Sequence, residues 1–520
     1  MEKRAIIKST GIISVATCLS RILGFLRDIM IAGFFGTGIF AQAFVVAFRV
    51  PNMLRDLVGE GATNAAFVPV LTEYRTIKSQ EDYWQLARTL LNVLIITLTL
   101  IVIAGVLASP LIVRLIAPGF IKEASKLQVT ITLTRALFPY LLLIGLSAYS
   151  MGVLNSLRHF AAPAFGPALL NASMIICGLI LCPRIGVMGL AVGVLAGGVL
   201  QLGLQVPVLF RKGFKIKGFN LVHPAARRIG KLLLPRMLGT AVYQINVFID
   251  TILASLSWIV GSGGVAALYY SNRLLQFPLA IFGLALAQVI LPTMSSHAAG
   301  NNLAKLKETL IFSLRTIFFI MIPASIGFIV LGRYIVSILF ERGAFGVYST
   351  AITNDALFFY CFGLFAYAGI KILVNCFYSM QDTMTPVKTA SLSLIVNVVL
   401  NLILMWPLKI GGLALATSIA GIFNFFLLFF LLQKKIGRIE WRQIAASFGR
   451  MLTAALIMGA FGYMLLKGCS FFSLTMGTVI FRLMKLLMLI GMSILVYLLG
   501  ALSLGVKEAR GAFRWILRKG

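Results

Sequence analysis

The chain has 520 residues, of which 60% are hydrophobic and only 12% are charged. Soluble proteins carry about a quarter charged residues, so this composition excludes a water-soluble globular protein and predicts a chain that uses lipid as its solvent. Lys and Arg number 46 against 15 Asp and Glu, a formal net charge of +31. Because these basic residues lie mostly in short gaps between apolar runs, they fit the positive-inside pattern of membrane proteins, and we expect no nucleic-acid partner.

The apolar runs predict an all-α polytopic membrane protein with about fourteen transmembrane helices. The N-terminal run is expected to be an uncleaved first helix, because no small-residue cleavage site follows it. The predicted spans are residues 10–34, 38–58, 85–109, 127–153, 161–181, 187–209, 230–256, 264–290, 308–330, 351–377, 385–408, 411–433, 446–467 and 479–504.

The uneven distribution of basic residues predicts the orientation of these helices. Every second gap is rich in Lys and Arg, most densely at residues 211–231 and 434–442, and the segment after residue 505 is also basic. The alternate gaps contain far fewer basic residues. Cytoplasmic loops carry the excess, so both termini are expected to face the cytoplasm, which agrees with an even number of spans.

The sequence also contains an internal duplication. Residues 163–191 are echoed by residues 386–414 at an offset near 223, in the spacing of their prolines and in a shared Gly-Leu-Ala, and residues 67–69 are echoed by 290–292. Each unit spans six predicted helices, so the two halves share one orientation. Parallel repeats of this kind pack about an axis along the membrane normal, with the substrate path between them.

Three parts are therefore expected along the chain. They are an N-terminal six-helix lobe (1–215), a C-terminal six-helix lobe (216–440), and two extra transmembrane helices with a basic cytoplasmic tail (441–520).

Several charged residues fall where lipid-facing helices cannot hold them. An arginine at the centre of a span costs about 2.5–3.5 kcal/mol unless it meets water or a partner, so we expect a hydrated cavity between the two halves. Arginine offers a planar fork that matches phosphate oxygens in pairs, so a group of them favours a diphosphate or a similar anion. The residues concerned are Arg21, Arg27, Asp28, Arg49, Arg55, Asp56, Glu60 and Arg273.

Internal ion pairs are an alternative explanation for part of this set. Arg27 could pair with Asp28 or Glu60, and Arg55 could pair with Asp56. Helix geometry leaves the choice open, because arginines six residues apart do not share one face of a straight helix. A bend at a glycine or proline would be needed to bring them together.

Enzymatic signatures are missing, so the chain is not expected to be an enzyme or to carry a cofactor or metal. No phosphate-binding glycine loop occurs, and the cysteines and histidines show no metal-ligand spacing. The energy source is then expected to be an ion gradient, the membrane potential or removal of the product. Asp250, inside a predicted span, and Asp382 are candidates for Na⁺ or H⁺ coupling, although helix capping or solvation explains Asp382 at least as well.

Three stretches of the sequence resemble a known family. They read SRILGFLRD at residues 20–28, FRVPNMLR at 48–55 and QDTMTP at 381–386. These motifs are similar to those of the MurJ (MviN) lipid II flippase family, which belongs to the multidrug/oligosaccharidyl-lipid/polysaccharide exporter superfamily. The resemblance spans nearly the whole chain and is most specific in the first hundred residues.

The resemblance implies a function. Such proteins carry the undecaprenyl-pyrophosphate-linked disaccharide-pentapeptide precursor of peptidoglycan, lipid II, from the cytoplasmic to the periplasmic leaflet of the bacterial inner membrane by alternating access. It also implies that the last two helices line a groove for the lipid tail. Besides lipid II and membrane lipids, cell-wall synthesis proteins are candidate partners. The expected substrate-binding residues are Arg21, Arg27, Arg49, Arg55 and Arg273, with Asp28, Glu60 and Asn272 in support.

Two positions depart from the family pattern. Some members have an acidic residue where this chain has Gln42, and a second basic residue where it has Asp56. The alternative function is a cation-coupled multidrug exporter of the same superfamily, which should show acids rather than arginines in its first-repeat cavity. A non-transporting scaffold would need no arginines inside the membrane.

Overall fold

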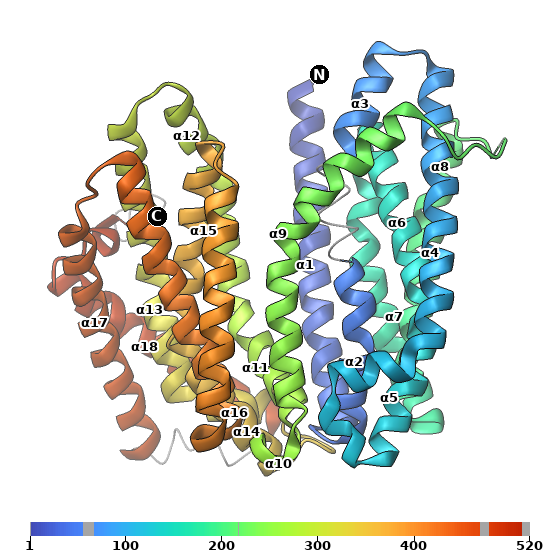
Figure 1. The fold of residues 1–520 in the computed structure, drawn as a ribbon. Coiled ribbons are helices and arrows are strands. Elements are labelled where there is room, and N and C mark those ends of the chain that lie inside the picture. The colour runs from blue at the N-terminus through green and yellow to red at the C-terminus, as the bar shows by residue number, and fades with distance from the viewer. Residues whose placement is uncertain (1, 56–66, 217, 469–477, 512–520) are drawn as a thin grey trace. The chain divides into compact units, whose positions relative to one another are not determined.

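The protein was analysed as a computed structural model, which describes residues 2–55, 67–216, 218–468 and 478–511. These residues form long helices joined by short connections, and they include no strand (Figure 1). The chain divides into two compact units, residues 1–256 with 342–344, and residues 257–341 with 345–520.

Among the described residues there are twenty helical elements, and the first unit contains ten of them. They are α1 (Glu2–Phe35), α2 (Ile39–Arg55), α3 (Val68–Ile77), α4 (Gln80–Ile116), the 3₁₀-helix η2 (Pro118–Lys122), α5 (Ala124–Leu137), α6 (Pro139–Ser156), α7 (Ala161–Ile185), α8 (Met188–Arg211) and α9 (Pro224–Ala254).

The second unit contains the remaining ten. They are α10 (Ser257–Val260), α11 (Gly264–Pro278), the π-helical turn η3 (Leu279–Gly283), α12 (Leu284–Ala299), α13 (Leu303–Phe340), α14 (Val347–Cys361), α15 (Leu364–Ser379), α16 (Met384–Ile436), α17 (Trp441–Gly468) and α18 (Val479–Ser503).

The predicted class, an all-α polytopic membrane protein, is confirmed. Within the described ranges, nine helices are long and apolar enough to cross a bilayer, or ten if the bent pair α14 and α15 forms one span. This count includes α16 as one span. Its 53 residues are more than twice the roughly 20 needed for one crossing of a bilayer, and its backbone turns at Lys409. The exact number of fourteen spans is therefore not confirmed.

Three predicted spans are interrupted in the structure. The span expected at 127–153 breaks at Pro139, and the one at 264–290 passes into a π-helical turn after Pro278. Proline removes a helical N–H and its ring crowds the preceding turn, which accounts for both interruptions. The span expected at 351–377 bends by 48° near Gly363, where an added Cβ would come within 2.9 Å of the Ser418 Cα on α16.

The predicted duplication is visible in the backbone. Arg158 and Gln381 both adopt positive φ, 58° and 61°, and they lie 223 residues apart. Gly186 and Lys409 are separated by the same interval and also share an unusual conformation, with φ of 60° and 51° and ψ of −145° and −126°. The same local turn therefore occurs at corresponding places in the two repeats, as the sequence offset predicted.

Small residues allow α7 and α8 to pack closely. Gly189, Gly193 and Gly197 recur every fourth residue on α8, so they lie on one face. An added Cβ at Gly193 or Gly197 would lie 2.9 Å from the Cα of Met174 or Leu170 on α7. Close backbone approach of this kind stabilises helix pairs in lipid, where no hydrophobic effect drives association.

The helix α9 belongs to the first compact unit, although it follows the predicted lobe boundary at residue 215. Arg49 on α2 donates to the Val247 carbonyl at 3.0 Å and to Thr251 Oγ1 at 2.6 Å, and the Gly119 N–H donates to Ser255 Oγ at 3.0 Å. These bonds attach α9 and its end to the first unit. The boundaries at 215 and 440 describe the sequence repeat and stay predictions.

The turn at Lys409 leads to a stability prediction. A non-glycine residue in this part of φ/ψ space is strained by about 1–3 kcal/mol, whereas the corresponding Gly186 adopts it readily. We expect Lys409→Gly to raise the thermal unfolding temperature in detergent. Gly186→Ala should lower the unfolding temperature. An added Cβ there meets nothing within 4 Å, so the cost arises from the positive φ of the backbone and not from a clash. An unchanged or lower transition for Lys409→Gly would contradict the strain argument.

Candidate functional site

Arg27 on α1 is buried, with 7% of its surface exposed, and it forms an ion pair with its neighbour Asp28. Its Nε and Nη2 donate to Asp28 Oδ1 at 3.1 and 2.8 Å. Its Nη1 donates to Asn171 Oδ1 on α7 at 2.9 Å. Of the two pairings considered for Arg27, the structure contains the one with Asp28, while Glu60 lies outside the described residues.

Asn171 holds α1 against α7, and sequence reasoning did not single it out. While its Oδ1 accepts from Arg27, its Nδ2 donates to the Ser20 carbonyl at 3.0 Å. Gly24 faces this amide, and an added Cβ there would lie 3.3 Å from Asn171 Nδ2. The available signal was an amide in the middle of an otherwise apolar span, since such a group needs polar partners when buried.

Arg21 occupies a different face of the same helix. Gly24, one of the positions where a bend could bring the arginines together, lies inside α1, which continues as one helix from Glu2 to Phe35. Six residues along a regular helix place Arg21 about 120° around the axis from Arg27. Arg21 is exposed and makes no hydrogen bond or ion pair with any residue that the structure describes.

The two arginines of α2 have different surroundings. The half-buried Arg49 bonds to a carbonyl and a hydroxyl of α9, both neutral, so its charge is not cancelled by these contacts. Arg55 ends α2 and is partly buried. Its proposed partner Asp56 lies outside the described residues.

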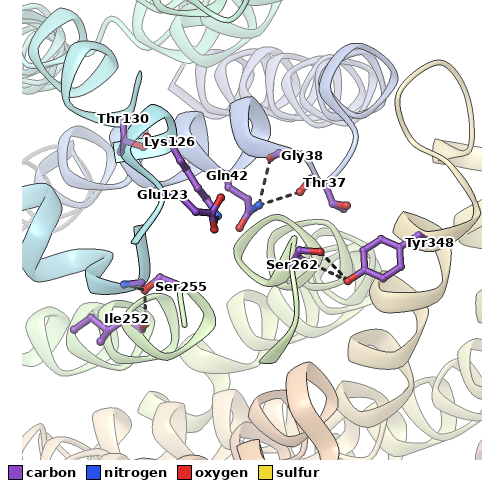
Figure 2. Close-up of polar contacts among 11 residues, drawn as sticks. Thr37, Gly38, Gln42, Glu123, Lys126, Thr130, Ile252, Ser255, Ser262 and Tyr348 are labelled. Carbon is purple, nitrogen blue, oxygen red and sulfur yellow. Dashed lines mark hydrogen bonds and ion pairs between the residues drawn. The ribbon is translucent and has the colours of Figure 1, made fainter. Parts of the chain in front are cut away.

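Gln42, one of the departures from the family pattern, supports the turn between α1 and α2. The side chain is buried, and its Nε2 donates to the carbonyls of Thr37 at 3.1 Å and Gly38 at 3.4 Å (Figure 2). A carboxylate could not donate to these carbonyls, because an ionised acid only accepts hydrogen bonds. The amide is therefore suited to this local role.

Lys126 was assigned to a gap between spans, but it lies inside α5 and is only 1% exposed. Its Nζ is 3.5 Å from Glu123 Oε1 (Figure 2) and 4.2 Å from the centre of the Phe120 ring. The apolar stem and the aromatic contact allow the lysine to remain buried beside a single carboxylate.

In the second unit, Arg273 is exposed on α11. Its Nη2 donates to Tyr269 Oη at 3.2 Å, and its guanidinium carbon lies 5.0 Å from the centre of the Tyr269 ring. The neighbouring Asn272 accepts a hydrogen bond from Gln276 Nε2 at 2.8 Å. The two contacts with Tyr269 are with a neutral side chain, so they do not cancel the charge of the guanidinium.

Lys371 is a further cation that sequence reasoning missed. It lies in α15 between two isoleucines, is partly buried, and makes no ion pair with the described part of the chain. Because an uncompensated cation within an apolar helix is costly, it belongs with the intramembrane arginines as a candidate for contact with an anion.

The two candidates for cation coupling also have defined partners. Asp250 Oδ2 accepts from Asn246 Nδ2 at 3.4 Å. Asp382 lies between α15 and α16, where Lys435 Nζ is 2.7 Å from its Oδ2 and the Thr385 N–H donates to its Oδ1 at 3.0 Å. No group of three or more His, Cys, Asp or Glu that could hold a metal occurs in the ranges described above.

The surroundings of Asp382 predict its response to pH. Partial burial raises its pKa, but the hydrogen bonds from Lys435 and Thr385 outweigh burial and lower the pKa to about 2. A carboxylate with a lowered pKa stabilises the fold above its unfolded pKa of about 3.9 and loses that effect only as the pH falls through about 2. Asp382→Asn should therefore leave the pH dependence of transport between about pH 5 and 8 unchanged. A shifted transport profile in that window would instead assign Asp382 to proton coupling.

Comparisons with known proteins identify the family. The family model described as lipid II flippase MurJ matches residues 31–486. The chain belongs to the lipid II flippase MurJ family. The probable lipid II flippase MurJ of Buchnera aphidicola subsp. Schizaphis graminum is 33% identical over 506 residues, which cover 96% of this chain and 97% of the relative. The lipid II flippase MurJ of Burkholderia cenocepacia is 33% identical over 430 residues, covering 81% and 83%.

Solved structures agree with this assignment. A lipid II flippase MurJ in an inward closed conformation matches with a TM-score of 0.80 and 27% identity, covering 94% of this chain and 97% of that one. A MATE-family multidrug transporter in an inward-facing conformation matches with a TM-score of 0.66 at 17% identity, covering 82% and 98%. The second likeness concerns the fold alone. As a MurJ-family protein, the chain is a multi-pass membrane transporter and not an enzyme.

Proposed function

We propose that this MurJ-family chain carries lipid II from the cytoplasmic to the periplasmic leaflet of the bacterial inner membrane by alternating access. The observation that carries the proposal is the family match over most of the chain, in a protein that holds arginines on α1 and α2 of the first compact unit and on α11 of the second. A diphosphate head group cannot enter hydrocarbon unaided, so fixed cations must replace its water.

The arginines are proposed to contribute to diphosphate binding in different ways. The exposed Arg21 and Arg273 present guanidinium edges that can bond phosphate oxygens in pairs. Arg49 and Arg55, partly buried on α2, add positive charge. Asp28 and Asn171 hold the Arg27 side chain in place, and Arg27 is proposed to contribute its positive charge to the site.

The supporting residues keep narrower roles in the proposal. Asp28 fixes the Arg27 side chain, and Asn272 belongs to the polar face of α11 beside Arg273. Glu60 is retained on sequence grounds alone.

The energy source is proposed to be the membrane potential or a Na⁺ or H⁺ gradient. Moving one elementary charge across a potential of 100 mV changes its free energy by about 2.3 kcal/mol. A transport path with surplus positive charge therefore responds strongly to the membrane potential. Asp250 and Asp382 stay the candidates for cation coupling, and at Asp382 a coupling cation would compete with Lys435. Both termini are proposed to lie in the cytoplasm, and cell-wall synthesis proteins stay candidate partners.

The decisive experiment measures which leaflet contains lipid II. Cells depleted of this protein should accumulate labelled lipid II in the cytoplasmic leaflet, and re-expression of the wild-type chain should restore its exposure at the periplasmic surface. Unchanged lipid II sidedness, together with increased sensitivity to cationic drugs, would favour the multidrug exporter instead.

A further inference from the structure

The second unit contains a cavity of about 990 Å³ beside the first half of α13. One wall is a face of α13, where lining positions between residues 304 and 320 recur every three or four residues. The connector from α16 to α17 and the segment that follows α18 form the other walls. α17 and α18 pack next to α13 (Figure 1). At 1.5 Å per residue, the α13 wall is about 24 Å long, comparable to one leaflet of a bilayer with its head groups.

The character of the cavity changes along α13. Lys307 lies near the start of the helix, and the aromatic side chains of Phe312 and Phe319 follow along the same wall. Arg438 on the connector lies at the charged end, since an added Cβ on the adjacent Gly437 would be 3.3 Å from Lys307 Nζ. Beyond residue 308 the α13 wall is apolar except for Arg315 and Thr316, so a charged end followed by a mainly apolar wall matches the order of head group and acyl chain in a phospholipid.

An ion pair fixes the wall formed by the segment after α18. Arg315 Nε lies 2.8 Å from Glu508 Oε1, and Arg315 Nη2 donates to Glu508 Oε2 at 3.1 Å. Both side chains are nearly buried, with 13% and 10% exposed. The two-point contact holds this segment against α13 and cancels the charge of Arg315.

Three further cations line the cavity without such partners. Lys307, Arg438 and Lys507 make no ion pair with the residues that the structure describes. The remaining acids of the lining are Glu308 and Glu440, and Glu440 accepts a hydrogen bond from Gln443. Apart from the Arg315–Glu508 pair, the lining therefore contains three cations and two acids, which leaves an excess of positive charge.

We propose that this cavity binds an anionic phospholipid, with its phosphodiester at Lys307 and Arg438 and one acyl chain along the α13 wall. Basic pockets between spanning helices recognise anionic head groups in this way. A zwitterionic head group would add its own cation among the lysine and arginine side chains and would bind less well. None of the arginines proposed to bind lipid II lines the cavity, so the proposal does not rest on those arginines.

The test compares lipid binding by the purified full-length protein and two charge-matched variants. The cavity variant combines Lys307→Gln, Arg438→Gln and Lys507→Gln. The control variant combines Lys305→Gln, Arg442→Gln and Arg510→Gln, which are exposed cations two to four residues along the chain from the cavity cations and do not line the cavity. Native mass spectrometry in detergent would measure the affinity for phosphatidylglycerol and for phosphatidylcholine with the same acyl chains.

We expect the wild-type protein to prefer phosphatidylglycerol. The cavity variant should bind it about 10- to 100-fold more weakly, and the control variant within about twofold of the wild type. Equal loss in both variants, no loss in the cavity variant, or equal binding of the two lipids would overturn the proposal. Displacement of phosphatidylglycerol by equimolar lipid II would also overturn it, by assigning the cavity to the transported lipid.

A second variant tests the cavity without changing its charge. Ala304 is an exposed lining residue in the first turn of α13, so Ala304→Trp should fill part of the charged end while leaving the fold intact. It should reduce phosphatidylglycerol binding while leaving the unfolding temperature of the lipid-free protein unchanged. Unaltered binding by this variant would place the lipid elsewhere on the protein.

Discussion

Replacing Arg273 with alanine should reduce lipid II translocation by at least about 100-fold while the protein remains folded. The guanidinium is exposed and contacts the neutral Tyr269 hydroxyl and ring, so its removal should cost the fold little. What is lost is a two-point, charge-assisted contact with phosphate. Each such hydrogen bond contributes about 1.5–3 kcal/mol, so losing two accounts for the expected size of the effect.

The measurement is the fraction of lipid II exposed at the periplasmic surface in cells that depend on the variant. Arg333→Ala is the matched control, because Arg333 is an exposed arginine on α13 of the same compact unit and is not in the proposed site. Arg273→Lys should retain partial activity, since it keeps the charge but not the planar fork. Normal translocation by Arg273→Ala would remove Arg273 from the mechanism.

The buried pair Arg27–Asp28 should have the largest effect on stability. Removing one partner of a buried ion pair leaves an uncompensated charge and costs about 3–5 kcal/mol, so Asp28→Ala should lower the thermal unfolding temperature strongly. The double variant Arg27→Met with Asp28→Leu removes both charges together, and it should recover most of that stability. Asp355→Ala, which removes an exposed acid, is the control and should change little.

The same double variant separates the two explanations for Arg27. If Arg27 serves only to bind Asp28 and Asn171, a refolded double variant should transport normally. Our proposal gives Arg27 a part in holding the pyrophosphate, so the double variant should be stable and inactive in the leaflet assay. Restored transport would reduce Arg27 to a structural role and leave Arg21, Arg49, Arg55 and Arg273 as the proposed contacts.

Sequence alone could predict many residues of the candidate site, but not which distant residues they bond to. The spacing of Arg21 and Arg27 on one helix indicated different faces, and the structure places one exposed and the other buried. Asn171 could not be predicted as a partner, because it lies 144 residues from Arg27 and becomes a neighbour only when α7 packs on α1. The pairing of Asp382 with Lys435, 53 residues later, depends in the same way on the fold of α16.

The sequence by itself determined that this is an all-α membrane protein with an internal repeat and with arginines inside its spans. These properties are local or periodic, because hydropathy, charge and the 223-residue offset can be read along the chain without knowing its neighbours in space. Only the tertiary structure decided that α9 joins the first compact unit, that Asp28 and Asn171 hold Arg27, and that a cavity beside α13 is lined by three cations with no ion pair among the described residues. These features arise from packing between distant segments, and the energy of a buried charge depends on what that packing brings to it.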